Sequence, residues 1–284
     1  MDLPIKKLYI DSAFRTADSK SASSFKIELP QTLTFPDPCI FLIDDICIPH
    51  SWYTVETDFN DRLYLRVQNL NLGSFWDGII QIHEGNYTGA SLANAIQSAI
   101  NNTFYSRDKF YCSYDINTNQ LKIGQNDRSL WYQILTDFDI STRLNGVFNP
   151  SQAYNPQTPK SINQVIGNYG ATQNGVYYAD TNPFVSSFLI LNGPPNLYLS
   201  SPNLGTFNSL AANSNTIIKK IPVTSDFGYM IIDRVQGNHD YMYCSKQTIR
   251  TLEFNLRDAS GNLIPLHGCN ISFSIVFSTS AEQF

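Results

Sequence analysis

The chain has 284 residues, enough for one large β domain or for one domain that carries a sizeable insertion. Only 15% of its residues are charged, against about 25% in an average soluble protein. Surfaces that end in protein–protein contacts are depleted of charge, although a drift toward Asn, Ser and Thr would have the same effect. The net charge of −5 argues against a basic surface for nucleic acid, and no stretch approaches the ~18 apolar residues of a membrane-spanning helix.

The cysteines indicate reduced, buried thiols in a protein made in the cytosol. Their number is odd, they are scattered, and none forms a Cys-x-x-Cys pair. The first ten residues lack the apolar segment typical of a signal peptide, so we do not expect secretion. The five positions are Cys39, Cys47, Cys112, Cys244 and Cys269.

The N-terminal part has the pattern of sandwich strands. In residues 24–30 and 62–67 apolar and polar residues alternate, which predicts strands with one buried and one outer face. Between them, residues 39–49 form an apolar run that Asp44 and Asp45 interrupt. Because a buried carboxylate needs a partner, we expect these two acids to be paired or to form a turn.

The middle of the chain predicts a compact α+β lobe. A short strand at 79–83 precedes Thr88, which is well placed to cap a helix over 88–102. A hairpin at 110–124 and a further strand at 131–135 follow. The helix carries an apolar stripe made of Leu92, Ile96 and Ile100, with Ala95 and Ala99.

The C-terminal third returns to sandwich strands. Residues 216–223 and 228–235 are apolar runs, and residues 251–257 and 271–278 alternate with period two. The polar cluster 258–262 between the last two is a turn of the kind that joins antiparallel strands. Both ends of the chain therefore predict two packed antiparallel sheets.

No motif of known chemistry occurs in the chain. It has no Gly-x-Ser-x-Gly, no His-Glu-x-x-His, no Walker A loop and no Gly-x-Gly-x-x-Gly. The four histidines lie far apart, and no acidic spacing matches a cation-binding loop. An enzyme on a sandwich scaffold, such as a glycosidase, would need two acids facing one cleft. We therefore predict a protein that is not an enzyme, with no catalytic, cofactor-binding or metal-binding residue.

Tyrosines on polar segments are the candidate interface or attachment residues. The stretch 144–182 is rich in Asn, Gln, Gly, Tyr and Pro and has weak periodicity. We expect it to be an extended connection, one that could reach a neighbouring subunit. Its tyrosines could anchor a protein interface or stack on sugars, whereas the negative net charge disfavours stacking on nucleic acid. The candidates are Tyr169, Tyr177, Tyr178, Tyr241 and Tyr243.

Several segments, taken together, give the chain a resemblance to a known family. Residues 8–12, 24–30, 44–53 and 84–88 resemble the penton (minor capsid) proteins of virophages and Polinton-like viruses. The strongest match is the stretch 252–277, which holds LEFNLRDASGN, LHG and SFSIVF. The resemblance covers most of the chain apart from about 144–182. Its motifs are structural, and none is catalytic.

This resemblance implies a single jelly-roll β-sandwich with an inserted small α+β domain. On that basis residues 1–72 and 183–284 would form the jelly roll, and residues 73–182 the insertion with its long connection. The family implies a structural subunit of the virion capsid, made in the host cytoplasm, that forms homopentamers at icosahedral five-fold vertices beside the major capsid protein. The alternative is a glycan- or receptor-binding β-sandwich that serves in attachment.

Overall fold

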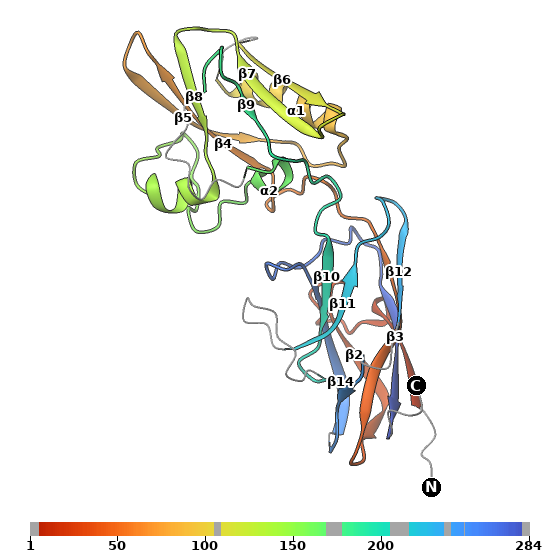
Figure 1. Ribbon diagram of the computed structural model, residues 1–284. Helices are drawn as coiled ribbons and strands as arrows, with labels where there is room; N and C mark the ends of the chain where they lie inside the picture. Colours follow the sequence, from red (N-terminus) through yellow and green to blue (C-terminus); the bar gives the residue numbers. More distant parts are fainter. Residues whose placement is uncertain are drawn as a thin grey trace. The chain divides into compact units, whose positions relative to one another are not determined.

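Antiparallel strands make up most of the regular structure in the computed structural model of this chain, which describes residues 6–104, 109–168, 178–204, 216–235, 240–246 and 248–279. The chain forms two units, one made of Met1–Trp52 with Pro194–Phe284 and the other of Tyr53–Gly193. The first holds two antiparallel sheets, and the second holds helices and two small sheets (Figure 1). The protein is therefore mainly β, with a sandwich interrupted by an α+β insertion, as the sequence predicted.

The first unit is a jelly roll. Its two sheets have the strand orders β1–β15–β3–β12 and β11–β10–β14–β2, and the short β13 also pairs with β3. Strands from both ends of the chain lie next to one another in each sheet, which is the two-sheet arrangement of a jelly roll. The strands are β1 (Lys6–Asp11), β2 (Ser24–Thr34), β3 (Ile40–Pro49), β10 (Asn196–Ser200), β11 (Ile217–Pro222), β12 (Met230–Arg234), β13 (Met242–Tyr243), β14 (Thr248–Arg257) and β15 (Ser272–Ser278). A 3-10 turn, η1 (Ser12–Phe14), follows β1.

Phenylalanine rings from both sheets fill the core of the jelly roll. Phe25 on β2 and Phe254 on β14 are direct partners in the ladder, with ring centroids 5.5 Å apart. Phe273 of the other sheet meets Phe254 edge to face at 4.9 Å. The alternation of apolar residues aims these side chains inward, so the two inner faces interlock.

A β-bulge explains the two acids that interrupt the apolar strand β3. Ser274 on β15 pairs with Asp45, and the next residue, Ile275, pairs with Ile43, so Asp44 is the extra residue. The Asp44 carboxylate accepts a bond from the Lys7 ammonium at 2.6 Å. The Asp45 carboxylate accepts a bond from the hydroxyl of Ser274. Both acids therefore have partners, as the sequence predicted.

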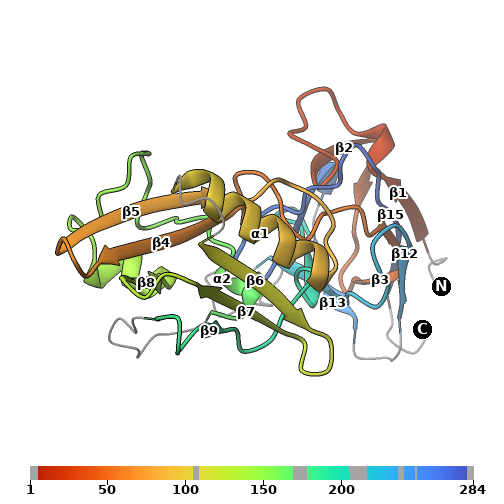
Figure 2. The same cartoon turned by 90° about the horizontal axis from the view of Figure 1, so that it is seen from above.

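The second unit packs a helix between two three-stranded sheets. The sheets have the orders β5–β4–β8 and β6–β7–β9. Figure 2 shows α1 running alongside β6 and β5. The elements are β4 (Arg62–Asn69), β5 (Ser74–Gln81), α1 (Gly89–Thr103), β6 (Phe110–Asp115), β7 (Gln120–Gln125), β8 (Leu130–Ile134), the π-helix η2 (Asp139–Arg143), α2 (Asn163–Ile166) and β9 (Phe184–Val185).

Helix α1 forms where the sequence predicted it. Thr88 is the N-cap, and its side chain and that of Ser91 satisfy each other's backbone N–H groups as a capping box. The predicted stripe of Leu92, Ile96 and Ile100 is completely buried. The stripe packs in the core that lies between the helix and both sheets.

Strand β4 departs from the sequence prediction because both of its faces are covered. Leu63 and Leu65 pack in the helix-side core, as their alternation suggests. The face expected to meet solvent is covered by the segment that follows β8: Tyr64 is 1% exposed and packs with Ile140 and Phe148. The first part of the predicted extended connection, residues 144–154, therefore packs on this face, whereas Ile162, Val165 and Ile166 belong to the helix-side core.

The division between the two units also differs from the boundaries predicted at 72 and 183. The first unit ends at Trp52 and resumes at Pro194. The physical reason is strand pairing: β4 is hydrogen-bonded along its length to β5 and also to β8, and β9 pairs with β7. Sequence periodicity shows that a segment is a strand but does not show which sheet it joins.

Candidate assembly surfaces

Strand β12 presents apolar side chains outward at the edge of a jelly-roll sheet. It is the last strand of that sheet and pairs with β3. Its residues alternate: Ile231 is completely buried, whereas Met230 is 47% and Ile232 is 55% exposed. An exposed strand edge is a natural template for contact with another chain, and these two side chains make this edge apolar.

Two of the tyrosines predicted as interface residues extend this edge. Tyr243 on β13 pairs with Ile40 of β3 and is 63% exposed. The ring of Tyr241 meets the ring of Tyr243 edge to face, with centroids 6.3 Å apart. We call Met230, Ile232, Tyr241 and Tyr243 the β12–β13 edge. The sequence did not point to Met230 and Ile232 as surface residues, because an apolar run such as 228–235 is typical of a buried strand.

On the inner face of β12, an ion pair connects this strand to the opposite sheet. Lys219 on β11 and Asp233 on β12 belong to different sheets, and their charged atoms lie 3.1 Å apart. Their side chains are only 8% and 15% exposed. Because the pair joins the two edge strands across the sandwich, it holds β12 in place, and the outward side chains are the ones left for contact.

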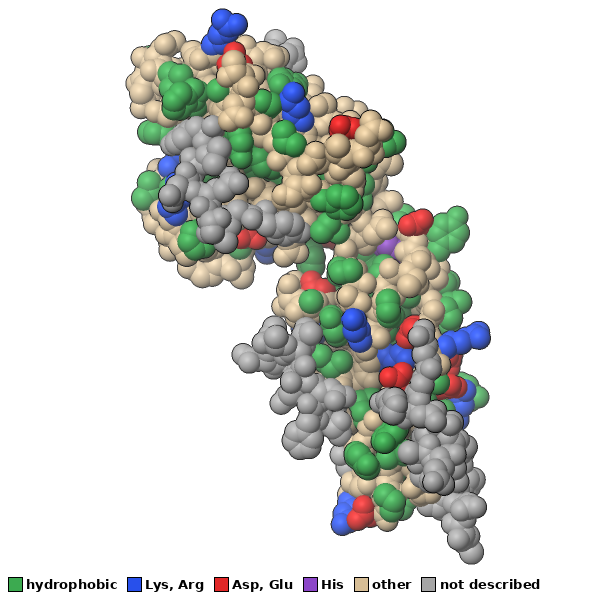
Figure 3. Space-filling view, in the orientation of Figure 1, with side chains coloured by type: hydrophobic (Ala, Val, Ile, Leu, Met, Phe, Trp, Pro, Cys, Tyr) green, Lys and Arg blue, Asp and Glu red, His purple; other side chains and the backbone are tan. Residues whose placement is uncertain are grey.

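A second surface lies on the β5–β4–β8 sheet. Phe75 on β5 and Trp131 on β8 are both paired with Gln68 of β4, so the three side chains form one row across the sheet. The aromatic residues are 51% and 41% exposed, and Leu72 in the adjoining turn is 76% exposed. We use the name aromatic row for the exposed hydrophobic residues of this surface, which are the two aromatic residues Phe75 and Trp131 and the neighbouring Leu72. Hydrophobic side chains reach the surface in both units (Figure 3).

A buried ion pair supports the aromatic row. The Arg66 guanidinium donates two bonds to the Asp77 carboxylate, at 2.6 and 2.7 Å. The same guanidinium lies over the Phe75 ring, 5.4 Å from its centroid, in a cation–π contact. Because both charged side chains are nearly buried, the orientation of Phe75 is restricted before any partner binds.

The remaining predicted tyrosines have other surroundings. Tyr178 is half-buried in the second unit, with its ring 5.5 Å from those of Tyr132 and Phe184. Burial raises the pKa of its hydroxyl. Its ring therefore contributes to the core. Tyr169 and Tyr177 lie outside the described residues.

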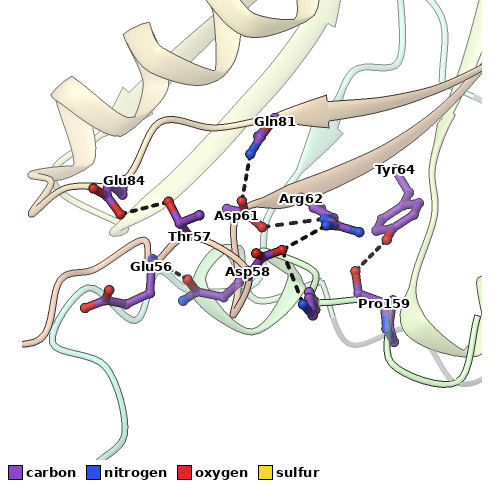
Figure 4. Close-up of polar contacts among 11 residues, drawn as sticks. Glu56, Thr57, Asp58, Asp61, Arg62, Tyr64, Gln81, Glu84 and Pro159 are labelled. Carbon is purple, nitrogen blue, oxygen red and sulfur yellow. Dashed lines mark hydrogen bonds and ion pairs between the residues drawn. The ribbon is translucent and has the colours of Figure 1, made fainter. Parts of the chain in front are cut away.

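Acidic residues near the start of β4 are held by structural partners. Asp61 is completely buried, accepts a bond from the Gln81 amide at 3.1 Å and lies beside Arg62. Asp58 accepts bonds from Arg62 and from Lys160, at 3.1 and 3.2 Å (Figure 4). Each of these acids has a basic or amide partner outside the loop, on β4, on β5 or in the segment before α2, so these contacts tether the loop.

The described part of the chain contains no group of three or more His, Cys, Asp or Glu residues arranged to hold a metal ion. Among the same residues, no helix is long and apolar enough to cross a membrane.

The fold and these surfaces define the class: a single jelly-roll protein with an inserted α+β unit and apolar residues exposed on a strand edge. No protein family matches the chain, and no curated protein matches it by sequence. Among solved structures, the crystal structure of the mavirus penton protein superposes with a TM-score of 0.51 at 10% sequence identity. The match covers 97% of this chain and 99% of that one. The chain therefore has a virophage penton-like fold, as the sequence resemblance predicted.

Proposed function

We propose that this protein is a penton subunit of a viral capsid, which forms homopentamers at the five-fold vertices and contacts the major capsid protein there. The observation that carries the proposal is the end-to-end match to the mavirus penton protein, which includes both the jelly roll and the insertion. The low proportion of charged residues also supports it, since surfaces buried between subunits are depleted of charge. In this role the protein acts by packing rather than by catalysis, in a virion assembled from chains made in the host cytoplasm.

The β12–β13 edge is a surface of the jelly roll that is suited to contact a neighbouring copy. In a ring of five identical chains each contact is heterologous, so one surface of a copy meets a different surface of the next. Met230 and Ile232 would contribute apolar area at such a contact, and Tyr241 and Tyr243 would add rigid aromatic contacts with hydroxyl groups.

Native mass spectrometry of the purified chain tests the proposal. We expect a species of five times the 32.0 kDa chain mass, alone or after mixing with the major capsid protein. The double variant Met230→Lys/Ile232→Lys should shift the mass to that of a monomer, because each contact would have to bury two lysines. The control Ile116→Lys, at a 79% exposed position of the second unit, should keep the pentamer. A chain that stays monomeric with and without the major capsid protein contradicts the proposal.

A second candidate function is attachment to a host glycan or receptor. The aromatic row supports it, because exposed rings held in a fixed orientation can stack on sugars. A glycan array probed with the purified protein should give binding that Trp131→Ala abolishes. Phe188→Ala, which removes another exposed ring of the same unit, should leave the binding unchanged. An array without hits would argue against glycan attachment and would leave the penton proposal untouched.

A further inference from the structure

Two cysteines that are far apart in sequence meet inside the jelly roll. Cys39 precedes β3 and Cys244 follows β13, and their sulfur atoms lie 3.4 Å apart. Both residues are at most 2% exposed. The Cys244 backbone N–H donates to the Cys39 carbonyl oxygen at 2.9 Å. The two residues thus extend the antiparallel ladder of β13 and β3 by one step.

Position in the ladder makes the two cysteines geometrically suited to a disulfide. Tyr243 pairs with Ile40, so Cys244 lies opposite Cys39 when the register is continued by one residue. Directly opposite residues of an antiparallel pair have Cα atoms about 4.5 to 5.5 Å apart. Disulfides span Cα distances of about 4.4 to 6.8 Å. The backbone therefore needs no rearrangement for the two sulfur atoms to be joined.

Cys39 is the thiol of the pair that a small reagent can reach. It lines a cavity of about 330 Å³ together with Lys6, Phe35 and Phe277. Burial raises the pKa of Cys39, but the hydrogen bond from the Cys244 thiol and the charge of Lys6 act in the opposite direction. Burial raises the pKa of Cys244, and its contact with Cys39 raises it further. Because Cys39 lines the cavity, it is the thiol that a small peroxide meets first.

We propose that Cys39 and Cys244 form a redox modification site, at which a small peroxide converts the two thiols to a disulfide. The Cys39 thiolate attacks one oxygen of hydrogen peroxide, the O–O bond breaks, and hydroxide leaves, so that Cys39 becomes a sulfenic acid. The deprotonated Cys244 sulfur then attacks the Cys39 sulfur, and a second hydroxide leaves as the S–S bond forms. With the two thiol protons, the products are one disulfide and two waters.

The disulfide would join the two chain segments of the jelly roll. Cys39 lies before the inserted unit and Cys244 lies after it, so the closed loop contains the whole of Tyr53–Gly193. Cross-links that close long loops stabilise a fold mainly by restricting the unfolded chain. If the proposed capsid function holds, the chain would assemble with reduced thiols in the cytosol and the bond would form after release into oxidising surroundings.

Oxidation of the purified full chain with hydrogen peroxide tests the proposal, independently of whether the chain is pentameric. After unreacted thiols are blocked, peptide mass spectrometry without reduction should show Cys39 linked to Cys244. The melting temperature should rise by several degrees and return to its original value with dithiothreitol. The reaction should become faster as the pH is raised, because the attacking group is a thiolate.

Cysteine variants complete the test. Cys39→Ser and Cys244→Ser should each abolish both the cross-link and the rise in melting temperature, and Cys47→Ser, at a partly exposed site of the same unit, should keep both. Because the wild-type comparison with and without dithiothreitol needs no variant, the test holds even if a serine variant folds poorly. Peroxide that only over-oxidises Cys39, a cross-link between other cysteines, or a cross-link without a rise in melting temperature would each overturn the proposal.

Discussion

On the sheet faces that point away from the main core, the ion pairs of the two units differ in burial. In the jelly roll the pair formed by Arg250 and Glu28 lies at the surface, with side chains 62% and 56% exposed. In the inserted unit Arg66 and Asp77 are only 10% and 6% exposed. Asp77 also accepts a bond from the backbone N–H of Asn149. The inserted unit therefore buries an ion pair and its backbone contact on a sheet face, whereas the near-buried pair of the jelly roll, Lys219 and Asp233, lies between its two sheets.

The number of covered faces explains this difference. The sheets of the jelly roll cover each other's inner face, so alternation can send polar residues to solvent. The β5–β4–β8 sheet is covered on one face by helix α1 and on the other by the segment that follows β8. Two polar residues that alternation directs to this second face, Arg66 and Gln133, are therefore buried, and each of them needs a partner.

Removing the buried charge partner should have the largest effect. Arg66→Leu leaves the Asp77 carboxylate buried without its cation, which should lower the free energy of unfolding by about 3–5 kcal/mol. Arg250→Leu removes the surface pair of the jelly roll and should change it by less than about 1 kcal/mol. Denaturant unfolding followed by tryptophan fluorescence measures both, since Trp52 reports on the first unit and Trp76 and Trp131 on the second. Equal losses would remove the contrast between the units.

Removing a buried amide should have a smaller effect of opposite sign. Gln133 on β8 is paired with Arg66 of β4 and is 2% exposed. Its amide nitrogen and oxygen have no hydrogen-bond partner among the described residues. Gln133→Met keeps the shape of the side chain and removes the unsatisfied atoms, so it should raise the unfolding free energy by about 1 kcal/mol. Gln68→Met, on the partly exposed row of the same face, should change it by less than about 0.5 kcal/mol. A loss of stability in Gln133→Met would mean that the amide does have a partner.

The smallest expected effect is on acid stability. Bonds from the Lys109 ammonium and from Ser129 hold the pKa of Asp127 at about 2. Because this pKa lies below that of the unfolded chain, the carboxylate stabilises the second unit at pH values above about 4, and the contribution is lost as the pH falls toward 2. In the Asp127→Asn variant the unfolding free energy should decrease less over this pH range than in the wild type, with a difference of at most about 1 kcal/mol. An unchanged slope would show that Asp127 is equally acidic in the unfolded chain.

The sequence by itself determined the local elements. Helix α1 follows from a capping threonine and an apolar stripe at helical spacing, both of which act within a few residues. The alternation in β2, β14 and β15 likewise predicts strands with one inward face, and the resemblance to pentons correctly supplied the jelly roll. Tyr241 and Tyr243 could be selected because they are aromatic residues on a polar segment.

Only the tertiary structure decided which sheet each strand joined and what covered its second face. Periodicity assigned β4 to the jelly roll with an outer face, yet its hydrogen bonds to β5 and β8 place it in the insertion with both faces covered. The same limit applies to Met230 and Ile232, whose exposure depends on β12 being an edge strand, and to Cys39 and Cys244, which a ladder brings together. Strand pairing and burial depend on residues far apart in the chain, and a local pattern carries no information about them.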